Sequence, residues 1–457
     1  MTARTKIDVH AGTLSMEFGD TLAEIMSAYL VPSLTQVGQL DPKSVYENSL
    51  SSPPPSDLKP LPKHLKYAYL DTEQQLPVII ANNLRQEQED KLLNVLRQQK
   101  KAIGWKLSNL PSINPSIYMH RILMKEEFKP IRQLQIRLNL TILDVVKKEV
   151  TKLLAAGIIY PISDSQWVSL VQVVPKKSRI TVYLCGFRIV DKKLNQATRK
   201  DHFPLPFIDH VLEKLSGKSH YCFLDGFLGY MQIYIAPEDH HKTTFTCPFG
   251  TFAYSRMPFG LCNASSTFQR CMTSIFSDLL QECMEVFMDD FTVYADSFDA
   301  CLENLSKVLR RCIDTNLVLN FEKCHLMVSE GIVLGHLISN RGIEVDKFKI
   351  NIITSLPNPI SVREVRSFLV HTGFYRRFVK NFSKLTLPLS RLLQKDVDFN
   401  FDQPCIEAFQ ELKSRLTSAP ILQAPNWDPL FELMCDASNS TLGAVLGQKL
   451  EPAAQCL

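Results

Sequence analysis

The sequence predicts a mixed α+β fold spread over several domains. With 457 residues the chain is too long for one ordinary domain of about 100–150 residues. Helical and strand-like segments mix without the regular strand–helix–strand order of a parallel α/β sheet, and no repeat of fixed period is present. Because 45% of the residues are hydrophobic and 21% are charged, the composition supports buried cores and excludes general disorder.

The sequence also argues against several classes of protein. No apolar run approaches the ~18–20 residues of a membrane span. The N-terminus, MTARTKIDVHAG, lacks the apolar region of a signal peptide, so we expect a protein that is not secreted. All twelve cysteines lie from Cys185 onward without any Cys-x-x-Cys pair, which indicates reduced core thiols rather than disulfides or a zinc finger.

The N-terminal part of the chain contains a linker, a helix and a strand. Residues 21–60 include SSPPPSD and few periodic apolar positions, which is typical of a linker. Residues 141–156 carry apolar side chains at the spacing of one helix face, and Gly157 follows as the expected C-cap. The run VSLVQVV at 168–174 predicts a strand.

The middle of the chain alternates between helix and strand patterns. Apolar spacing predicts a short helix over 207–215, and alternation over 221–235 predicts a strand that runs into a turn or helix. A longer helix is predicted over 265–281, with Ser265 or Ser266 as its N-cap.

A pair of aspartates marks the next element. Residues 284–294, MEVFMDDFTVY, are strand-like on both sides of Asp289 and Asp290, which predicts a hairpin with both carboxylates at its bend. Adjacent carboxylates at a strand turn repel each other, and a divalent cation such as Mg²⁺ removes that cost. Taken alone, an Asp-Asp pair in an apolar run is more often a simple hairpin turn than a catalytic site.

A third aspartate strengthens the metal interpretation. Asp225 follows another strand-like run, and two strands lying side by side would bring it next to Asp289. Carboxylates placed in this way could hold two metal ions for phosphoryl transfer.

Two basic stretches stand out on a chain whose net charge is only +4. Residues 171–200 contain eight basic side chains and Asp191 as the one acidic residue, and residues 363–395 contain eight basic side chains and Glu364. Such stretches indicate contact with a polyanion. Two solvated charged faces are the simpler explanation of the charge pattern taken alone.

Four ordered motifs resemble those of reverse transcriptases. They are FLDGFLGYMQI (223–233), TTFTCPFGTFAYSRMPFGLCNASSTFQ (243–269), VFMDDFTVY (286–294) and GIVLGHLIS (331–339). Their order and spacing match palm motifs A, B and C and the primer grip of gypsy-type long-terminal-repeat (LTR) retrotransposons, most closely those of plants. The similarity runs from about residue 60 to the C-terminus, so the chain resembles the reverse transcriptase region of a Pol polyprotein.

The resemblance implies an α+β right-hand polymerase fold with fingers, an antiparallel palm sheet and a thumb. The implied domains are a residual protease tail (1–20), the linker (21–60), a pre-polymerase segment (61–119), fingers and palm (120–340), a thumb or connection region (341–428) and the truncated start of an RNase H-like domain (429–457). No Asp-Thr-Gly or Asp-Ser-Gly occurs, so we expect no protease activity. Only Asp436 stands at an RNase H metal-ligand position, so we expect no ribonuclease H activity either.

The resemblance also implies roles for individual residues. The metal-binding catalytic aspartates would be Asp225, Asp289 and Asp290. The nucleotide-binding residues would be Tyr230 as the aromatic steric gate, Phe259 and Gly260 in MPFGL, and the basic Lys176, Lys177 and Arg188 against the triphosphate. The primer grip would be Leu334, Gly335 and His336, with Lys323 near the mobile palm loop. Taken alone, Tyr230 and Phe259 would be interpreted as core aromatics.

The sequence departs from the family pattern in one important place. Between Lys177 and Phe187 the family normally has a longer insertion, so the resemblance implies that the fingers hairpin is shorter here by roughly a dozen residues or more. Prolines usual in relatives are replaced by Leu134, Leu140, Leu170 and Ser265, and a usual glycine by Val370. These changes are typical of a decaying copy.

The family implies an RNA-directed DNA polymerase that acts on an RNA or DNA template–primer and deoxynucleoside triphosphates. Its cofactor would be Mg²⁺, with Mn²⁺ as a substitute, and other Pol or Gag segments of the element would be its partners. It would act in a virus-like particle in the cytoplasm, in the nucleus, or in both, without a membrane. Two alternatives stay open: a nucleic-acid-binding remnant with impaired catalysis, and a product that does not fold stably.

Overall fold

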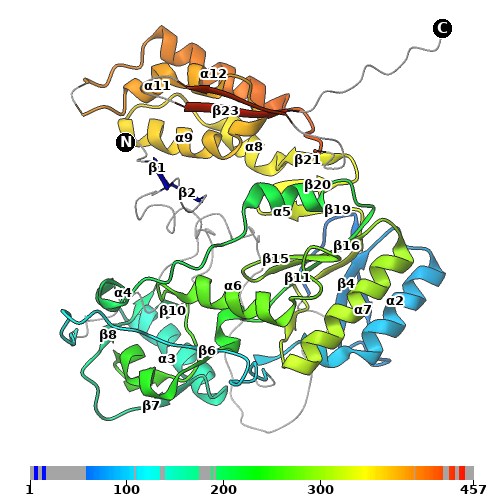
Figure 1. Ribbon diagram of the computed structural model, residues 1–457. Helices are drawn as coiled ribbons and strands as arrows, with labels where there is room; N and C mark the ends of the chain where they lie inside the picture. Colours follow the sequence, from blue (N-terminus) through cyan, green and yellow to red (C-terminus); the bar gives the residue numbers. More distant parts are fainter. Residues whose placement is uncertain are drawn as a thin grey trace. The chain divides into compact units, whose positions relative to one another are not determined.

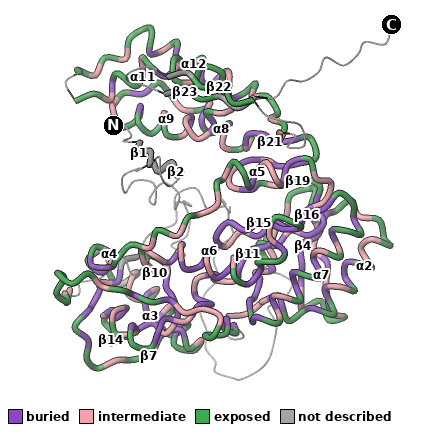
Figure 2. Tube along the Cα trace, in the orientation of Figure 1, coloured by how far each residue is buried: buried purple, intermediate pink, exposed green. Residues whose placement is uncertain are grey.

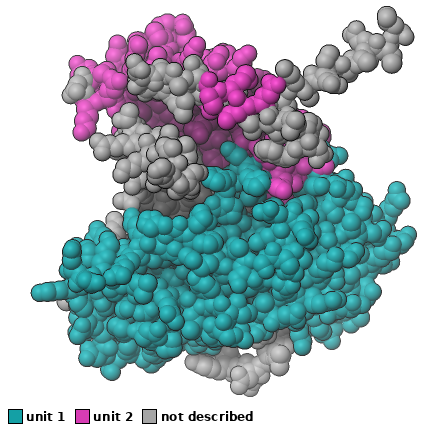
Figure 3. All heavy atoms as spheres, in the orientation of Figure 1, with its two compact units in different colours: residues 1–211, 218–340 teal, residues 212–217, 341–457 magenta. Residues whose placement is uncertain are grey.

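The computed structural model describes residues 58–107, 110–133, 139–173, 192–395 and 397–425, together with the short strands 5–8, 13–16, 187–188, 432–437 and 442–447. Most of the predicted linker at 21–60 lies outside these residues. The chain divides into two compact units, one formed by residues 1–211 and 218–340 and the other by 212–217 and 341–457 (Figure 3).

A six-stranded sheet is the centre of the first unit (Figure 1). In spatial order its strands are β15 (Met284–Phe287), β16 (Asp290–Ala295), β11 (His220–Asp225), β18 (His325–Val328), β4 (Pro77–Ala81) and β3 (Leu65–Tyr69). All neighbouring strands are antiparallel except β18 and β4, which are parallel. The segment before residue 119 therefore extends the same sheet that carries the aspartate motifs.

Three helices pack around this sheet. Helix α7 (Phe298–Thr315) contacts β16 and β11, α2 (Gln86–Gln98) contacts α7, and α6 (Ala264–Ile275) contacts β15. Figure 2 shows that the strands β11 and β16 are buried along most of their length. The apolar side of each helix supplies the rest of the core.

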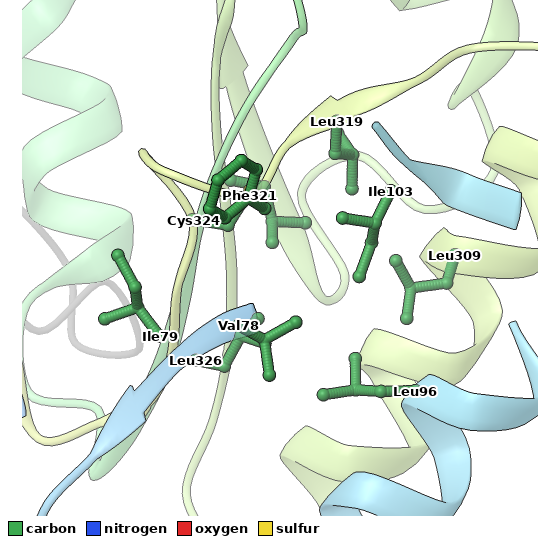
Figure 4. A pocket seen from close by; sticks show the side chains of 10 residues that line it. Val78, Ile79, Leu96, Ile103, Leu309, Leu319, Phe321, Cys324 and Leu326 are labelled. Atoms are coloured by element: carbon green, nitrogen blue, oxygen red, sulfur yellow. The ribbon is translucent and has the colours of Figure 1, made fainter. Parts of the chain in front are cut away.

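A small apolar cavity remains where the sheet meets α2 and α7 (Figure 4). Its lining residues are Val78, Ile79, Leu96, Ile103, Leu224, Leu309, Leu319, Phe321, Cys324 and Leu326. All of these side chains are hydrocarbon apart from one thiol. We interpret the cavity as a packing gap, because polar groups that could orient a ligand do not line it.

A second sheet of the first unit has four strands. They are, in order, β7 (Ile159–Pro161), β14 (Gly250–Tyr254), β13 (Phe245–Cys247) and β8 (Ser169–Leu170). Helix α3 (Leu140–Ala155) packs against β7 and confirms the helix predicted at 141–156. Gly157 follows it with φ +64°, the left-handed conformation that a glycine C-cap favours. The predicted strand at 168–174 is split into β8 and β9 (Gln172–Val173).

Shorter elements complete the first unit. The pairs are β1 (Thr5–Asp8) with β2 (Thr13–Met16), β5 (Ile103–Gly104) with β17 (Leu319–Asn320), β6 (Met119–His120) with β12 (Tyr234–Ile235), β9 with β10 (Phe187–Arg188), and β19 (Glu330–Val333) with β20 (His336–Ser339). The short helices are η2 (Lys100–Ala102), α4 (Lys192–Ala197), η4 (Gly229–Gln232) and η5 (Pro237–Thr243). The predicted strand and turn at 221–235 correspond to β11, η4 and β12. The predicted helix at 207–215 is α5 (Ile208–Leu215), whose residues from 212 onward belong to the second unit.

The start and end of α6 differ from the prediction. Its N-cap is Asn263, because the helical hydrogen bond from Thr267 N–H to the Asn263 carbonyl already forms at 2.9 Å. The prediction of Ser265 or Ser266 as the cap is therefore wrong, and both serines lie inside the first turn. The helix ends at Ile275 rather than at residue 281. Residues 276–279 continue the chain as turns, in which Phe276 and Leu279 stay buried.

The second unit is mainly helical. Its elements are β21 (Gly342–Val345), α8 (Lys347–Ser355), α9 (Val362–Phe374), η6 (Arg376–Phe378), α10 (Phe382–Leu385), α11 (Leu387–Arg391), α12 (Gln403–Thr417), and the paired strands β22 (Glu432–Ala437) and β23 (Leu442–Gly447). Helix α12 contacts α8, α10 and α11. The rings of Phe368 and Phe409, with centroids 4.3 Å apart, lie in its core.

Two global expectations can be compared with the described residues. Every cysteine among them is a free thiol, and eight of the ten are buried, as expected for reduced core thiols. In this part of the chain no helix combines the length and the apolarity needed to cross a membrane.

Candidate active site

Two neighbouring strands of the large sheet bring the three aspartates together. In the antiparallel pair β11–β16, Asp225 is the register partner of Asp290. In the hairpin β15–β16, Phe287 pairs with Asp290, which leaves Met288 and Asp289 as the two turn residues. The predicted hairpin with both carboxylates at its bend is therefore confirmed, and Asp225 lies beside it at the end of β11.

The turn between β15 and β16 has an unusual backbone. Met288 has φ +55°, a conformation that residues other than glycine rarely adopt but that tight hairpins require. The Met288 N–H donates to Gln269 Oε1 at 2.7 Å, and Gln269 Nε2 donates to the Val286 carbonyl at 3.2 Å. The Gly226 N–H donates to the Asp289 carbonyl at 3.3 Å and connects the turn to the end of β11.

Burial and mutual repulsion dominate the electrostatics of the aspartates. The pKa of Asp290 is raised to about 7, first by burial and then by the carboxylates of Asp289 and Asp225. The pKa of Asp225 is raised to about 6 by burial, although the Lys323 ammonium partly opposes this. Lys323 Nζ lies 3.2 and 3.0 Å from the two carboxylate oxygens of Asp225. This cluster therefore carries negative charge that favours a nearby cation.

The three aspartates supply suitable ligands for a hard divalent cation. Carboxylate oxygens are the groups that Mg²⁺ prefers, and the raised pKa values show that uncompensated charge is costly here. Among the described residues, no three carboxylate, imidazole or thiolate groups are already arranged as a metal-binding cluster. Since Lys323 pairs with Asp225, a metal ligand shell would require this ion pair to rearrange.

Tyr230 lies next to the aspartate turn, in η4. Its ring packs against Phe259 and Phe268, with centroids 5.0 and 5.3 Å away. Its hydroxyl lies 3.2 Å from Ser265 Oγ and donates to Met288 Sδ at 3.6 Å. Burial is the main cause that raises the pKa of Tyr230 to about 12, so the phenol is neutral. The structure thus brings Tyr230 and Phe259 together beside the hairpin turn.

The other predicted nucleotide-binding residues are only partly described. Gly260 has φ +105°, and its carbonyl accepts a hydrogen bond from Asn195 Nδ2 at 2.8 Å. Lys176 and Lys177 lie outside the described residues. For Arg188 only the backbone is described, in β10, where it pairs with Gln172.

The predicted primer grip forms a second tight hairpin. Val333 pairs with His336, so Leu334 and Gly335 are the two turn residues, with φ values of +46° and +78°. Positive φ at both positions is typical of the type I′ turn that matches strand twist. His336 is buried, and its Nδ1 lies 3.1 Å from the Leu334 carbonyl.

This second hairpin is connected to the strand that carries Asp225. Strand β19 contacts β11. A Cβ atom added to Gly331 would overlap the ring of Phe223, so the two strands approach too closely for a side chain at residue 331. The hairpin that carries the Leu334–His336 turn therefore packs directly against β11 through its first strand.

Three contacts of the site were missed from the sequence. Gln269 was hidden in the apolar pattern of its helix, although a glutamine on a buried face is a signal that could have indicated a polar partner. Ser265 was predicted only as a helix cap, so its contact with the Tyr230 hydroxyl was missed. The ion pair between Lys323 and Asp225 was missed because it joins residues far apart in the chain. None of these contacts leaves a periodic pattern in the sequence.

Comparisons with known proteins show which families and folds the chain is similar to. Residues 174–338 match the family model "Reverse transcriptase (RNA-dependent DNA polymerase)", and residues 401–455 match "RNase H-like domain found in reverse transcriptase". A foamy viral protease-reverse transcriptase in complex with double-stranded DNA has the same fold, with a TM-score of 0.71 at 18% identity, over 80% of this chain and 64% of that chain. Another structure of the foamy viral protease-reverse transcriptase, in complex with an RNA/DNA hybrid, gives a TM-score of 0.68 at 19% identity, over 78% and 47% of the two chains.

Curated relatives come from transposons. The retrovirus-related Pol polyprotein from transposon 297 of Drosophila melanogaster is 35% identical over 81% of this chain and 35% of its own length. The Pol polyprotein from transposon gypsy of the same species is 34% identical over 68% of this chain and 31% of its own length. The chain thus spans about a third of these relatives. From these matches, the chain contains a reverse transcriptase domain and an RNase H-like domain of the kind found in transposon Pol polyproteins.

Proposed function

We propose that this chain is the reverse transcriptase region of the Pol polyprotein of a plant gypsy-type LTR retrotransposon. It would transfer deoxynucleotides to a primer 3′-hydroxyl on an RNA or DNA template. The observation that supports this most directly is the register pair of Asp225 and Asp290, with Asp289 in the adjoining turn. Buried acidic groups with raised pKa values, next to one another at the end of two strands, are typical of functional sites.

In this proposal the three aspartates hold Mg²⁺, or Mn²⁺ in its place. When bound, such metal ions activate the attacking hydroxyl and stabilise the leaving pyrophosphate. The aspartates would have to be ionised, and Lys323 would have to release Asp225. The ammonium of Lys323 offsets the buried charge of Asp225 until then.

The remaining residues would bind the substrates. Tyr230 would exclude a ribose 2′-hydroxyl, with Phe259 and Gly260 next to the nucleotide. The basic residues Lys176, Lys177 and Arg188 would contact the triphosphate, because fixed cations stabilise developing negative charge. The turn Leu334–His336 would hold the primer terminus. The exposed cations of 363–395 would contact the phosphate backbone without reading sequence.

The domain order of the sequence comparison belongs to the same proposal. Fingers and palm would occupy 120–340, and a thumb or connection region 341–428. A residual protease tail would precede them at 1–20, and an RNase H-like start would follow at 429–457. The chain would act in a virus-like particle in the cytoplasm or in the nucleus, with Pol or Gag segments of the same element as its partners and without secretion.

A second candidate function is nucleic-acid binding without efficient polymerisation. The feature that favours it is the short sequence between Lys177 and Phe187, which leaves fewer residues for the fingers hairpin than the resemblance to the family implies. Displacing a group that positions substrate by ~1 Å can cost about a hundredfold in rate. The metal-binding aspartates would be unaffected.

Primer extension on an RNA template with Mg²⁺ tests both candidates. We would compare the chain, a variant with the family-length hairpin restored, and Asp289→Asn in each of them. The matched control is Asp299→Asn, because Asp299 is an exposed carboxylate in the first turn of α7.

If the chain is a reverse transcriptase, at least the restored version extends primers and Asp289→Asn abolishes extension without weakening template binding. Asp299→Asn should leave extension unchanged. Salt-dependent binding by the chain with extension only in the restored version would favour the impaired remnant. Extension that survives Asp289→Asn would contradict the proposed site.

A further inference from the structure

The side chain of Gln269 is one of the most deeply buried polar groups near the aspartates. It lies on α6 with 2% of its surface exposed, between apolar neighbours of the core. In protein mutants, burying an amide without a hydrogen bond destabilises the fold by about 1–3 kcal/mol. The contacts of this amide therefore explain why a glutamine is tolerated here.

Both ends of the Gln269 amide bind the backbone of the hairpin turn. Its Oε1 accepts from the Met288 N–H at 2.7 Å, and its Nε2 donates to the Val286 carbonyl at 3.2 Å. These two backbone groups flank Phe287, where the strand turns into the bend. The side chain therefore connects the middle of α6 to the bend of the hairpin that follows it in the chain.

The turn needs this support because of its backbone conformation. A residue other than glycine with a left-handed backbone is disfavoured by about 1–2 kcal/mol. Met288 has this conformation, with φ +55°. The hydrogen bonds to Gln269 offset that cost and leave Asp289 as the next residue of a defined turn.

The position of Asp289 is further restricted on two sides. Its carbonyl accepts from the Gly226 N–H at 3.3 Å. On the other side, its Cβ lies 3.2 Å from where a Cβ on Gly229 would be, so η4 leaves little free space beside it. A shift of the Met288 backbone would therefore change the direction of the Asp289 carboxylate.

We infer that Gln269 is a positioning residue that orients the Asp289 carboxylate toward the divalent cations. This inference rests on the proposed function for the role of Asp289. Gln269 itself would not contact the metal or the substrate. It would act through the backbone of Met288.

The test compares Gln269→Met, which has a similar size but lacks the amide, with Gln269→Asn, which keeps an amide too short to reach both backbone groups. Thr273→Val is the matched control, because the Thr273 hydroxyl binds only the Gln269 carbonyl within the same helix among the contacts described. The measurements are hydrogen exchange of the Met288 amide in the metal-free chain and binding of Mn²⁺ alone.

Both Gln269 variants should raise exchange of the Met288 amide by at least about tenfold. They should also weaken Mn²⁺ binding by about 10–100-fold, the range typical for groups that orient metal ligands. The control should change neither. Adding Met288→Gly to Gln269→Met should restore part of the Mn²⁺ affinity, because glycine adopts a positive φ without strain.

Unchanged Mn²⁺ affinity in a folded Gln269 variant whose Met288 amide exchanges freely would overturn the inference. Unchanged exchange in both variants would overturn it as well. If Mn²⁺ binding to the original chain does not respond to Asp289→Asn, the proposed function fails instead. The exchange measurement would then still decide whether Gln269 holds the turn.

Discussion

At the scale of single residues, the buried aspartates make the fold sensitive to pH. The pKa values of Asp225 and Asp290 are raised to about 6 and about 7, whereas an exposed aspartate ionises near ~4. Between about pH 4 and 7 the folded state therefore binds protons that the unfolded chain has already released. The contribution of these groups to stability falls as the pH rises through that window and stays constant above it.

We therefore expect Asp290→Asn to stabilise the metal-free chain more at pH 8 than at pH 5. The measurement is the difference in melting temperature between the variant and the original chain at each pH. The difference is needed because burial lowers the pKa of His120 to about 4, which gives a slope of the opposite sign. Asp278→Asn is the control, since Arg311 lowers the pKa of that exposed aspartate.

The control should show no growing difference between pH 5 and pH 8, because a lowered pKa moves its titration below that window. A stabilisation by Asp290→Asn that is the same at both pH values would contradict the raised pKa. Added Mg²⁺ should reverse the order at pH 8, because only the original chain keeps the full set of carboxylate ligands.

At the scale of elements, helix α6 connects the two segments around the aspartates. Gln269 binds the β15–β16 turn, and Ser265, one turn earlier, lies 3.2 Å from the Tyr230 hydroxyl in η4. Ser265 stands at a position where the family pattern has a proline. In the structure it instead contributes a hydrogen bond to the residue proposed as the steric gate.

Ser265→Ala should therefore destabilise the chain by about 1 kcal/mol, the usual net contribution of one hydrogen bond. The rings of Phe259 and Phe268 would still hold Tyr230 in place, so the change should remain small. Urea unfolding would measure the stability. In the hairpin-restored chain, the ratio of deoxynucleotide to ribonucleotide incorporation should fall as the gate becomes more mobile.

Ser266→Ala is the matched control, because it removes the same hydroxyl from the next position of the helix. It should change stability by less than about 0.5 kcal/mol. Equal effects of the two substitutions would show that the contact between Ser265 and Tyr230 contributes nothing.

At the scale of the whole molecule, the sequence predicted what depends on local patterns. The helix before Gly157 and the hairpin around Asp289 were correct, since helix spacing and strand alternation are each contained in a short stretch of chain. The parallel pairing of β4 with β18 was not predicted, because it joins residues more than 200 positions apart and leaves no periodic signal.

In the candidate site, too, the features that depend on local motifs were predicted, and those that depend on tertiary packing were not. The positions of the aspartates followed from motifs, and the register between β11 and β16 agrees with them. The contacts made by Gln269 and Lys323 depend on tertiary packing, which places a polar group opposite a partner from another element. The cap of α6 was predicted wrongly because asparagine and serine are both favoured N-cap residues, and Asn263 lies only two positions before Ser265.

The basic stretch 363–395 allows a prediction about the binding of nucleic acid. In the second unit, Arg363, Arg366 and Lys380 are exposed, whereas Arg377 is half-buried and lies 4.0 Å from Glu213. Exposed cations that contact phosphates release counterions on binding, and each contact contributes about 0.9 to the slope of log K against log salt. A paired, half-buried arginine contributes to the fold instead.

Replacing Arg363, Arg366 and Lys380 together by glutamine should therefore reduce the magnitude of the salt slope for duplex binding by up to about 3. The melting temperature should change little, because these side chains are exposed. Arg377→Gln should do the opposite: it should leave the slope unchanged and lower the melting temperature. Fluorescence anisotropy with a labelled duplex between low and moderate salt gives the slope. If the triple variant keeps the original slope, the stretch is a solvated face and the phosphate contacts must lie elsewhere on the chain.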